Sequence, residues 1–97
     1  MKLEWDERKN RTNIHKHGFD FSDADELFAG PSLFRPDTRE DYGEERWQGV
    51  GLIRGRVAEV VFVILGEETF RVISLRRATR KERVYYEKEI KNRLGSN

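Results

Sequence analysis

Apolar positions in the first third of the chain are sparse and recur at helical rather than strand spacing. The stretch Glu7–His17 is almost entirely polar, follows the N-cap candidate Asp6 and stops before Gly18, a residue type that readily ends helices. It predicts a helix that docks lightly on the rest of the fold. The residues expected to face the core are Asn10, Ile14 and His17.

A second short helix is predicted after Ser22, its expected N-cap, and before Gly30-Pro31. Its apolar stripe consists of Ala24, Leu27 and Phe28. Phe19 and Phe21 lie in the link between the two helices and are expected to anchor it in the core. Ahead of both helices, Leu3–Trp5 is a short strand candidate.

From Ser32 onward the apolar period becomes two, which is typical of strands. The expected strands are Ser32–Arg35, Arg46–Ile53, Val57–Leu65 and Thr69–Leu75. Val57–Leu65 is apolar almost throughout and should be a central strand covered on both faces. Gly49 and Gly51 share the face of Trp47, which predicts that another element packs closely there. Residues 36–45 form a long polar loop.

A last helix is predicted from Arg80 to Arg93, ending near Gly95. Thr79 and Glu82 have the spacing of a capping box, in which each side chain bonds the other's backbone N–H. The predicted order is therefore β-α-α-β-β-β-β-α. This order indicates an α+β fold, one domain over residues 1–97, with an antiparallel sheet and its helices on one face.

Composition narrows the class of protein. The chain has 97 residues and no cysteine, so neither a disulfide nor a thiolate is available. No apolar run approaches the roughly 18 residues of a membrane span. We expect a cytoplasmic protein that does not contact membranes. His15 and His17, two positions apart on a helix, point in different directions and cannot share one ion, so no metal and no other cofactor is expected.

Charge is divided unevenly along a chain whose net charge is only +1. Residues 1–45 hold seven Lys/Arg and twelve Asp/Glu, whereas residues 46–97 hold twelve and six. A cationic cluster is expected where the last strand meets the last helix, and it consists of Arg71, Arg76, Arg77, Arg80, Lys81 and Arg83. Cations are unfavourable at the positive end of a helix dipole, unless an anion binds there.

Two interpretations of this cluster remain open: an ordinary solvated face and a phosphate-binding site. Arginine forks suit phosphate groups. Tyr85 and Tyr86 follow the cluster and Trp47 is expected nearby on the sheet. Aromatic rings beside cations are typical of sites for single-stranded nucleic acid, where bases stack and phosphates pair with arginine.

Two motifs add a resemblance to a known family. The stretch EWDERKNRTNIHKHGFDFSDA resembles the pattern W-D-x-x-K-x-x-x-N-x-x-K-H-G-x-x-F-x-x-A of BrnT-type toxins. It matches at Trp5, Asp6, Lys9, Asn13, Lys16, His17, Gly18, Phe21 and Ala24. The stretch VISLRRATRKERVYYEKE resembles the family's I-S-x-R-x-A-x-x-x-E-R-x-x-Y pattern. It matches at Ile73, Ser74, Arg76, Ala78, Glu82, Arg83 and Tyr86.

The resemblance implies a RelE-like fold and a metal-independent endoribonuclease that cuts RNA and stops translation. It also implies a cognate, DNA-binding antitoxin of the BrnA type. The toxin would contact operator DNA only through this antitoxin. Two other functions remain open from the residues. One is a non-catalytic nucleic-acid-binding module, and the other is an interaction domain whose cations receive an acidic antitoxin segment.

Such chemistry needs a group that removes the proton of the 2′-hydroxyl and cations that stabilise charge on phosphorus. We expect Arg76 to stabilise the phosphate and His17 or Glu82 to act as base. Tyr86 is expected to stack on a base or relay a proton. Each has a structural alternative: a helix-end histidine, a capping-box glutamate and a packing tyrosine. The expected RNA contacts are Lys16, Arg71, Arg77, Arg80, Lys81 and Arg83.

Overall fold

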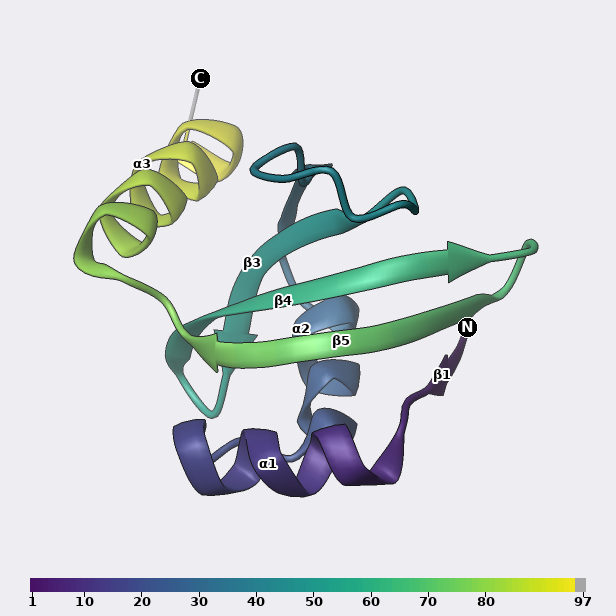
Figure 1. Cartoon of the computed structure of the whole chain (residues 1–97). Helices are drawn as coiled ribbons and strands as arrows, with labels where there is room; N and C mark the ends of the chain where they lie inside the picture. Colours follow the sequence, from purple (N-terminus) through teal and green to yellow (C-terminus); the bar gives the residue numbers. More distant parts are fainter. Residues whose placement is uncertain (96–97) are drawn as a thin grey trace.

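The computed structural model describes residues 1–95. It confirms the predicted order of elements, which Figure 1 shows. The strands are β1 (Lys2–Glu4), β2 (Leu33–Pro36), β3 (Trp47–Ile53), β4 (Arg56–Leu65) and β5 (Thr69–Arg77). The helices are α1 (Glu7–His17), α2 (Ala24–Ala29) and α3 (Arg80–Gly95), with a 3₁₀ turn at Phe21–Asp23. Asp20, rather than the expected Ser22, caps that turn.

One five-stranded sheet, in the order β1-β5-β4-β3-β2, organises the fold. β4 is central, as its apolar sequence predicted. The predicted antiparallel meander is confirmed for β2–β5, but the sheet is not antiparallel throughout, because β1 pairs with β5 in parallel, with Leu3 opposite Phe70. A strand of three residues on an open edge has no turn that fixes its direction, so the sequence pattern left this pairing undetermined.

The helices lie on both faces of the sheet, not on one as predicted. α1 and α2 cover one face, and α3 lies across the other (Figure 1). The first face has the larger core, made of Phe19, Phe21, Ala24, Leu27, Ile53, Ala58, Val60, Phe62, Val72 and Leu75. The second has Leu33, Val50, Val57, Ala78 and Tyr86. Both faces of β3 and β4 carry apolar residues, so both need a cover.

Amide side chains, rather than apolar ones, dock α1. Asn13 Nδ2 donates to the carbonyls of Leu75 (2.8 Å) and Phe19 (3.0 Å), and Leu75 N–H donates back to Asn13 Oδ1 (3.1 Å). Asn13 thereby pairs with β5 where β1 has already ended. Ile14 is 40% exposed and His17 is exposed, so their predicted contact with the core was wrong. Buried backbone groups need partners, and the two buried asparagines supply them.

A β-bulge interrupts the pairing of β4 with β5. Val61 lies opposite Ser74, but its neighbour Phe62 lies opposite Val72, which leaves Ile73 without a partner position. Beyond the bulge, Glu59 lies opposite Arg76. A bulge of this kind re-aims the side chains that follow it.

The close packing predicted at the two glycines of β3 is confirmed. A Cβ on Gly51 would lie 2.9 Å from Leu27, and one on Gly49 would lie 2.8 Å from Phe34. Gly51 thus lets α2 pack closely on the sheet, and Gly49 makes room for the Phe34 ring of the neighbouring strand β2. Within residues 1–95, no helix has the length and the apolar character needed to span a membrane.

Candidate active site

A buried carboxylate, Glu59, lies at the centre of a charged network on the α3 face of the sheet. Its side chain is 1% exposed. Gln48 on β3 donates a hydrogen bond to it. Arg76, on β5, places its Nη2 3.1 Å from Oε2 of Glu59. Arg39 Nη1 approaches the same oxygen at 3.5 Å. A buried charge is costly unless it is paired, so these partners are what allow Glu59 to remain there.

Arg76 is held between two carboxylates. Its Nη1 and Nη2 each lie 2.9 Å from an oxygen of Glu82, and Nη1 also donates to the carbonyl of Arg77. The hydrogen bonds that Arg76 donates to Glu82, followed by the charge of Glu59, raise the pKa of Arg76 although burial opposes this. Arg76 is therefore a fixed positive charge whose side chain is still 26% exposed.

Arg39 brings a second guanidinium to Glu59 from the loop between β2 and β3. It forms a forked pair with Asp37, with Nε–Oδ1 at 2.7 Å and Nη2–Oδ2 at 2.8 Å. Hydrogen bonding to Asp37 raises the pKa of Arg39, and the same bonds lower the pKa of Asp37. Because half of the Arg39 side chain remains exposed, this arginine can also meet a ligand.

Glu82 joins α3 to the network. The predicted capping box is confirmed: Thr79 N–H donates to Glu82 Oε1 (2.9 Å), and Glu82 N–H donates to Thr79 Oγ1 (3.1 Å). Burial raises the pKa of Glu82, but the hydrogen bonds from Arg76 and Thr79 outweigh it, and the pKa falls below its usual value. A carboxylate whose pKa is lowered is a weaker proton acceptor, which favours positioning over base catalysis.

This lowered pKa predicts how stability depends on pH. The contribution of the charged Glu82 is complete above its ordinary pKa of 4.5 and is lost as the pH falls through the lower folded value. We expect the melting temperature of the wild type to exceed that of Glu82→Gln at neutral pH. At about pH 3 the difference should shrink. Thermal unfolding followed by circular dichroism measures both, and an unchanged difference would contradict the assignment.

A basic cleft of about 790 Å³ lies where α1, β5 and the β3–β4 hairpin end together. Its lining residues with basic side chains are Lys16, His17, Arg54, Arg56, Arg76 and Arg77. α1 ends there because Gly18 adopts a left-handed conformation (φ 76°), and cations are favourable at that end of a helix. Arg54 pairs with Asp23 at 3.1 Å. Within residues 1–95, the side chains of Lys16, Arg56 and Arg77 have no acidic partner.

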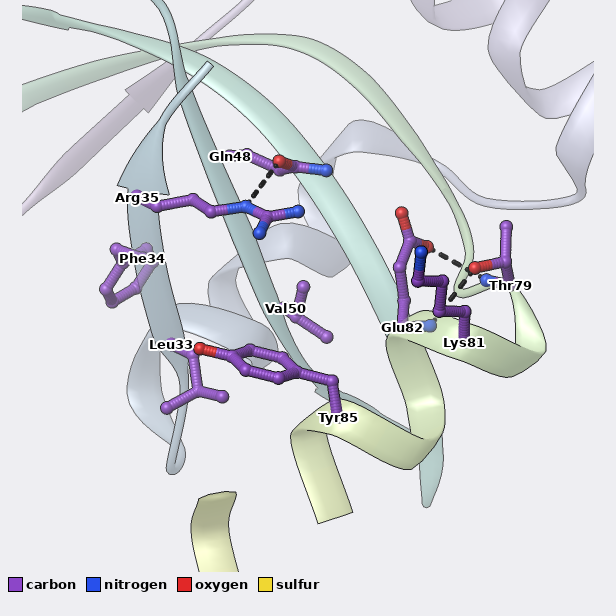
Figure 2. A pocket seen from close by; sticks show the side chains of 9 residues that line it. All are labelled: Leu33, Phe34, Arg35, Gln48, Val50, Thr79, Lys81, Glu82 and Tyr85. Carbon is purple, nitrogen blue, oxygen red and sulfur yellow. Dashed lines mark hydrogen bonds between the residues drawn. The ribbon is translucent and has the colours of Figure 1, made fainter. Parts of the chain in front are cut away.

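A second hollow, called here the α3 pocket, opens between α3 and the β2–β3 edge (Figure 2). It measures about 330 Å³ and is lined by Leu33, Phe34, Arg35, Gln48, Val50, Thr79, Lys81, Glu82 and Tyr85. Glu82 thus faces this pocket while its partner Arg76 lines the basic cleft. The charged network separates the two hollows.

Comparison with known proteins places this arrangement in a family. Residues 5–82 match the family model described as "Ribonuclease toxin, BrnT, of type II toxin-antitoxin system". The chain belongs to the BrnT family. A 1.1 Å crystal structure of the Brucella abortus ribonuclease toxin BrnT is similar, with a TM-score of 0.67 and 36% identity, over 82% of this chain and 99% of that one. No curated protein matches the chain in sequence.

Membership of the BrnT family establishes the general function. The protein is a ribonuclease toxin of a type II toxin–antitoxin system, and it therefore has an antitoxin as partner. The mixed α+β fold predicted from the sequence also agrees with the BrnT crystal structure.

The structure brings four of the sequence-predicted site residues together in this BrnT-family fold. Lys16, His17, Arg76 and Arg77 line the basic cleft, although they come from opposite ends of the chain. Arg71 was wrongly expected to join them. It lies near the start of β5 and pairs with Glu4 at 3.3 Å, five strand positions from Arg76, or about 17 Å.

Tyr86 is placed by packing. Its side chain is 3% exposed, and its hydroxyl donates to the carbonyl of Pro31 (2.7 Å). Burial raises its pKa. The neighbouring Tyr85 is 49% exposed and lines the α3 pocket, so stacking on a base is open to Tyr85 rather than to Tyr86.

The remaining predicted cations lie in the first turn of α3. Arg80, Lys81 and Arg83 are exposed, and none has an acidic partner within residues 1–95. Lys81 lines the α3 pocket. Across the same residues, no group of three histidine, cysteine or acidic side chains could hold a metal ion.

Sequence reasoning missed the centre of the network. Glu59, Gln48, Arg39 and Arg35 were assigned to strands and loop without a role. One signal was present, because Glu59 is the single charged residue within the apolar run Val57–Leu65. Acidic side chains are almost never fully buried unless they are paired, so an acid in a predicted central strand indicates a partner.

Proposed function

We propose that the basic cleft and the charged network together form the RNA-cleaving centre, and that cleavage uses the 2′-hydroxyl of RNA without a metal ion. One observation carries this proposal: Arg76, fixed between Glu59 and Glu82, lines the same cleft as His17. A preorganised positive charge beside a side chain able to transfer protons is the pair that such a reaction needs.

In this proposal, the field of Arg76 stabilises the charge that develops on phosphorus. Four contacts to protein oxygens occupy both Nη atoms, so within residues 1–95 only Nε–H of Arg76 lacks a partner. Arg39 supplies a second, half-exposed guanidinium on the same carboxylate. The transition state is thus stabilised by charges already in place, which need no reorganisation during the reaction.

We assign proton transfer to His17, because histidine performs this role most often and His17 lies exposed in the cleft. Lys16, Arg77 and Arg56 would hold the RNA backbone. Glu82 orients Arg76, and Tyr86 fixes α3 on the sheet through its bond to Pro31.

The partner is proposed to be a BrnA-type antitoxin that carries the DNA-binding domain of the complex, so that the toxin meets operator DNA only through it. Both proteins would act in the cytoplasm, where the RNA is. The exposed cations of Arg80, Lys81 and Arg83 support contact with a polyanion or an acidic segment.

The purified chain is expected to cut single-stranded RNA equally well with and without a chelator such as EDTA. The 5′ fragment should end in a 2′,3′-cyclic phosphate, because the attacking group is the neighbouring 2′-hydroxyl. Gel analysis of end-labelled RNA measures both. The matched control is the same oligonucleotide with one 2′-deoxy residue at the cut position, which should resist cleavage.

Loss of activity in EDTA that returns with a divalent metal would contradict the metal-independent mechanism. Expression in a bacterial host, with and without the protein encoded by the adjacent gene, tests the biology. Growth arrest with cut RNA agrees with the proposal, whereas arrest with intact RNA indicates a non-catalytic binding module.

A further inference from the structure

We infer that the α3 pocket binds one guanine base of the RNA and gives the toxin a sequence preference, with Arg35 as the residue that determines it. The inference rests on the proposed function, since it requires RNA as the substrate. The charged network that separates the α3 pocket from the basic cleft would then lie between a bound base and the reacting phosphate.

The pocket has the size and lining of a small-ligand site. Its volume of about 330 Å³ lies within the range of roughly 300–1,000 Å³ that is usual for such sites. Leu33 and Val50, each 7% exposed, give it an apolar floor. Polar groups are few and come from defined elements: Arg35 from β2, Gln48 from β3, and the start of α3.

Arg35 is oriented by a chain of hydrogen bonds that begins at Glu59. Gln48 donates its amide N–H to Glu59, which leaves its Oε1 to accept from Arg35 Nε at 3.0 Å. This bond fixes the plane of the guanidinium. Within residues 1–95, the two terminal nitrogens of Arg35 have no partner. Both terminal nitrogens of Arg35 are therefore free to donate parallel hydrogen bonds to a ligand in the pocket.

Guanine is the base whose acceptors and donors match this pocket. Its O6 and N7 accept a forked pair from arginine, whereas adenine presents an N–H donor in place of O6. The Watson–Crick edge of guanine carries N–H donors, and the Glu82 carboxylate in the wall can accept from them.

Tyr85 supplies the stacking surface. Figure 2 shows its ring extending from α3 across the pocket toward β2, while Arg35 extends from β2. Exposed aromatic rings hold bases of single-stranded RNA by stacking, which favours no particular base. Affinity would therefore come from Tyr85 and selectivity from Arg35.

Binding of short, fully 2′-O-methylated RNA tests this without cleavage. Fluorescently labelled hexamers of adenosine that carry one central guanosine, adenosine or 7-deazaguanosine are titrated with the full chain, and fluorescence anisotropy is measured. We expect the hexamer with guanosine to bind at least about 10-fold more tightly than the hexamer with adenosine. The 7-deaza base lacks N7 and should lose most of that gain.

Arg35→Gln should bring the three hexamers to within about twofold of each other, because the fork that reads O6 and N7 is gone. Arg93→Gln is the matched control. It removes the same charge, but Arg93 is exposed and lies outside the pocket. It should keep the preference. Tyr85→Ala should weaken all three hexamers alike, and Tyr85→Phe should not.

Equal affinity of the wild type for all three hexamers would overturn the guanine pocket and leave the cleavage proposal intact. A preference that survives in Arg35→Gln would remove Arg35 from the readout and overturn it too. If no oligonucleotide binds, whatever its sequence, the proposal that RNA occupies this face fails as a whole.

Discussion

Replacing Arg76 with alanine is expected to lower RNA cleavage by at least about 100-fold, the usual effect of removing one preorganised charge-stabilising group. Arg76 both lines the basic cleft and contacts the buried network. In the proposed mechanism, its loss removes the fixed charge that stabilises the scissile phosphate. Single-turnover cleavage of a labelled RNA measures the effect.

Arg76→Ala also leaves Glu59 and Glu82 without their shared partner, so part of any loss could come from unfolding. The assay therefore needs a temperature at which circular dichroism shows every variant to be folded. Arg76→Lys, which keeps a charge but not the forked contact with Glu82, should also cleave poorly.

Arg71→Ala is the matched control, because it removes an arginine from the same strand at a position that pairs with Glu4. It should cleave at the wild-type rate. Folded Arg76→Ala that cleaves as fast as Arg71→Ala would place the active site elsewhere.

Replacing Glu59 with alanine is expected to destabilise the fold by about 3–5 kcal/mol, the usual cost of removing one partner of a buried ion pair. The carboxylate is 1% exposed and is approached by Gln48, Arg39 and Arg76. Without it, two guanidiniums and an amide lose an acceptor in a site that water reaches poorly. Urea unfolding followed by tryptophan fluorescence measures the change in the free energy of unfolding.

The exposed pair of Glu4 with Arg71 provides the comparison. Its side chains are 46% and 41% exposed, and Glu4→Ala should cost no more than about 1 kcal/mol. Glu59→Gln, which keeps the shape and one acceptor, should fall between the two. A cost for Glu59→Ala as small as that for Glu4→Ala would show that the network does not hold the sheet face together.

Periodicity predicted the elements of this fold well because each strand and helix follows its own local rule. The central strand, the capping box and the glycine contacts of β3 all followed from patterns within a few residues. The placement of α3 did not. A strand pattern shows that Val50 and Leu52 are covered, but not which helix covers them, because that depends on the path of the chain.

The candidate site was predictable in part. The cations of the C-terminal half and His17 were recognised, and the structure brings Arg76 and His17 to one cleft. The acidic side of the network was missed because the partners of Glu59 come from a separate strand and loop: Gln48 lies 11 positions and Arg39 lies 20 positions before it in the chain. Such pairs are long-range, and no spacing in the sequence records them.

The bulge at Ile73 decides whether Arg76 or its neighbour Leu75 lies opposite Glu59. If the register that pairs Phe62 with Val72 continued along β5, Leu75 would lie opposite Glu59. A shift of one residue exchanges the two faces of a strand. Arg76 therefore owes its place opposite Glu59 to the single residue that the bulge leaves unpaired. In an uninterrupted ladder the same sequence would point a leucine at the carboxylate, although every proposed site residue would still be present.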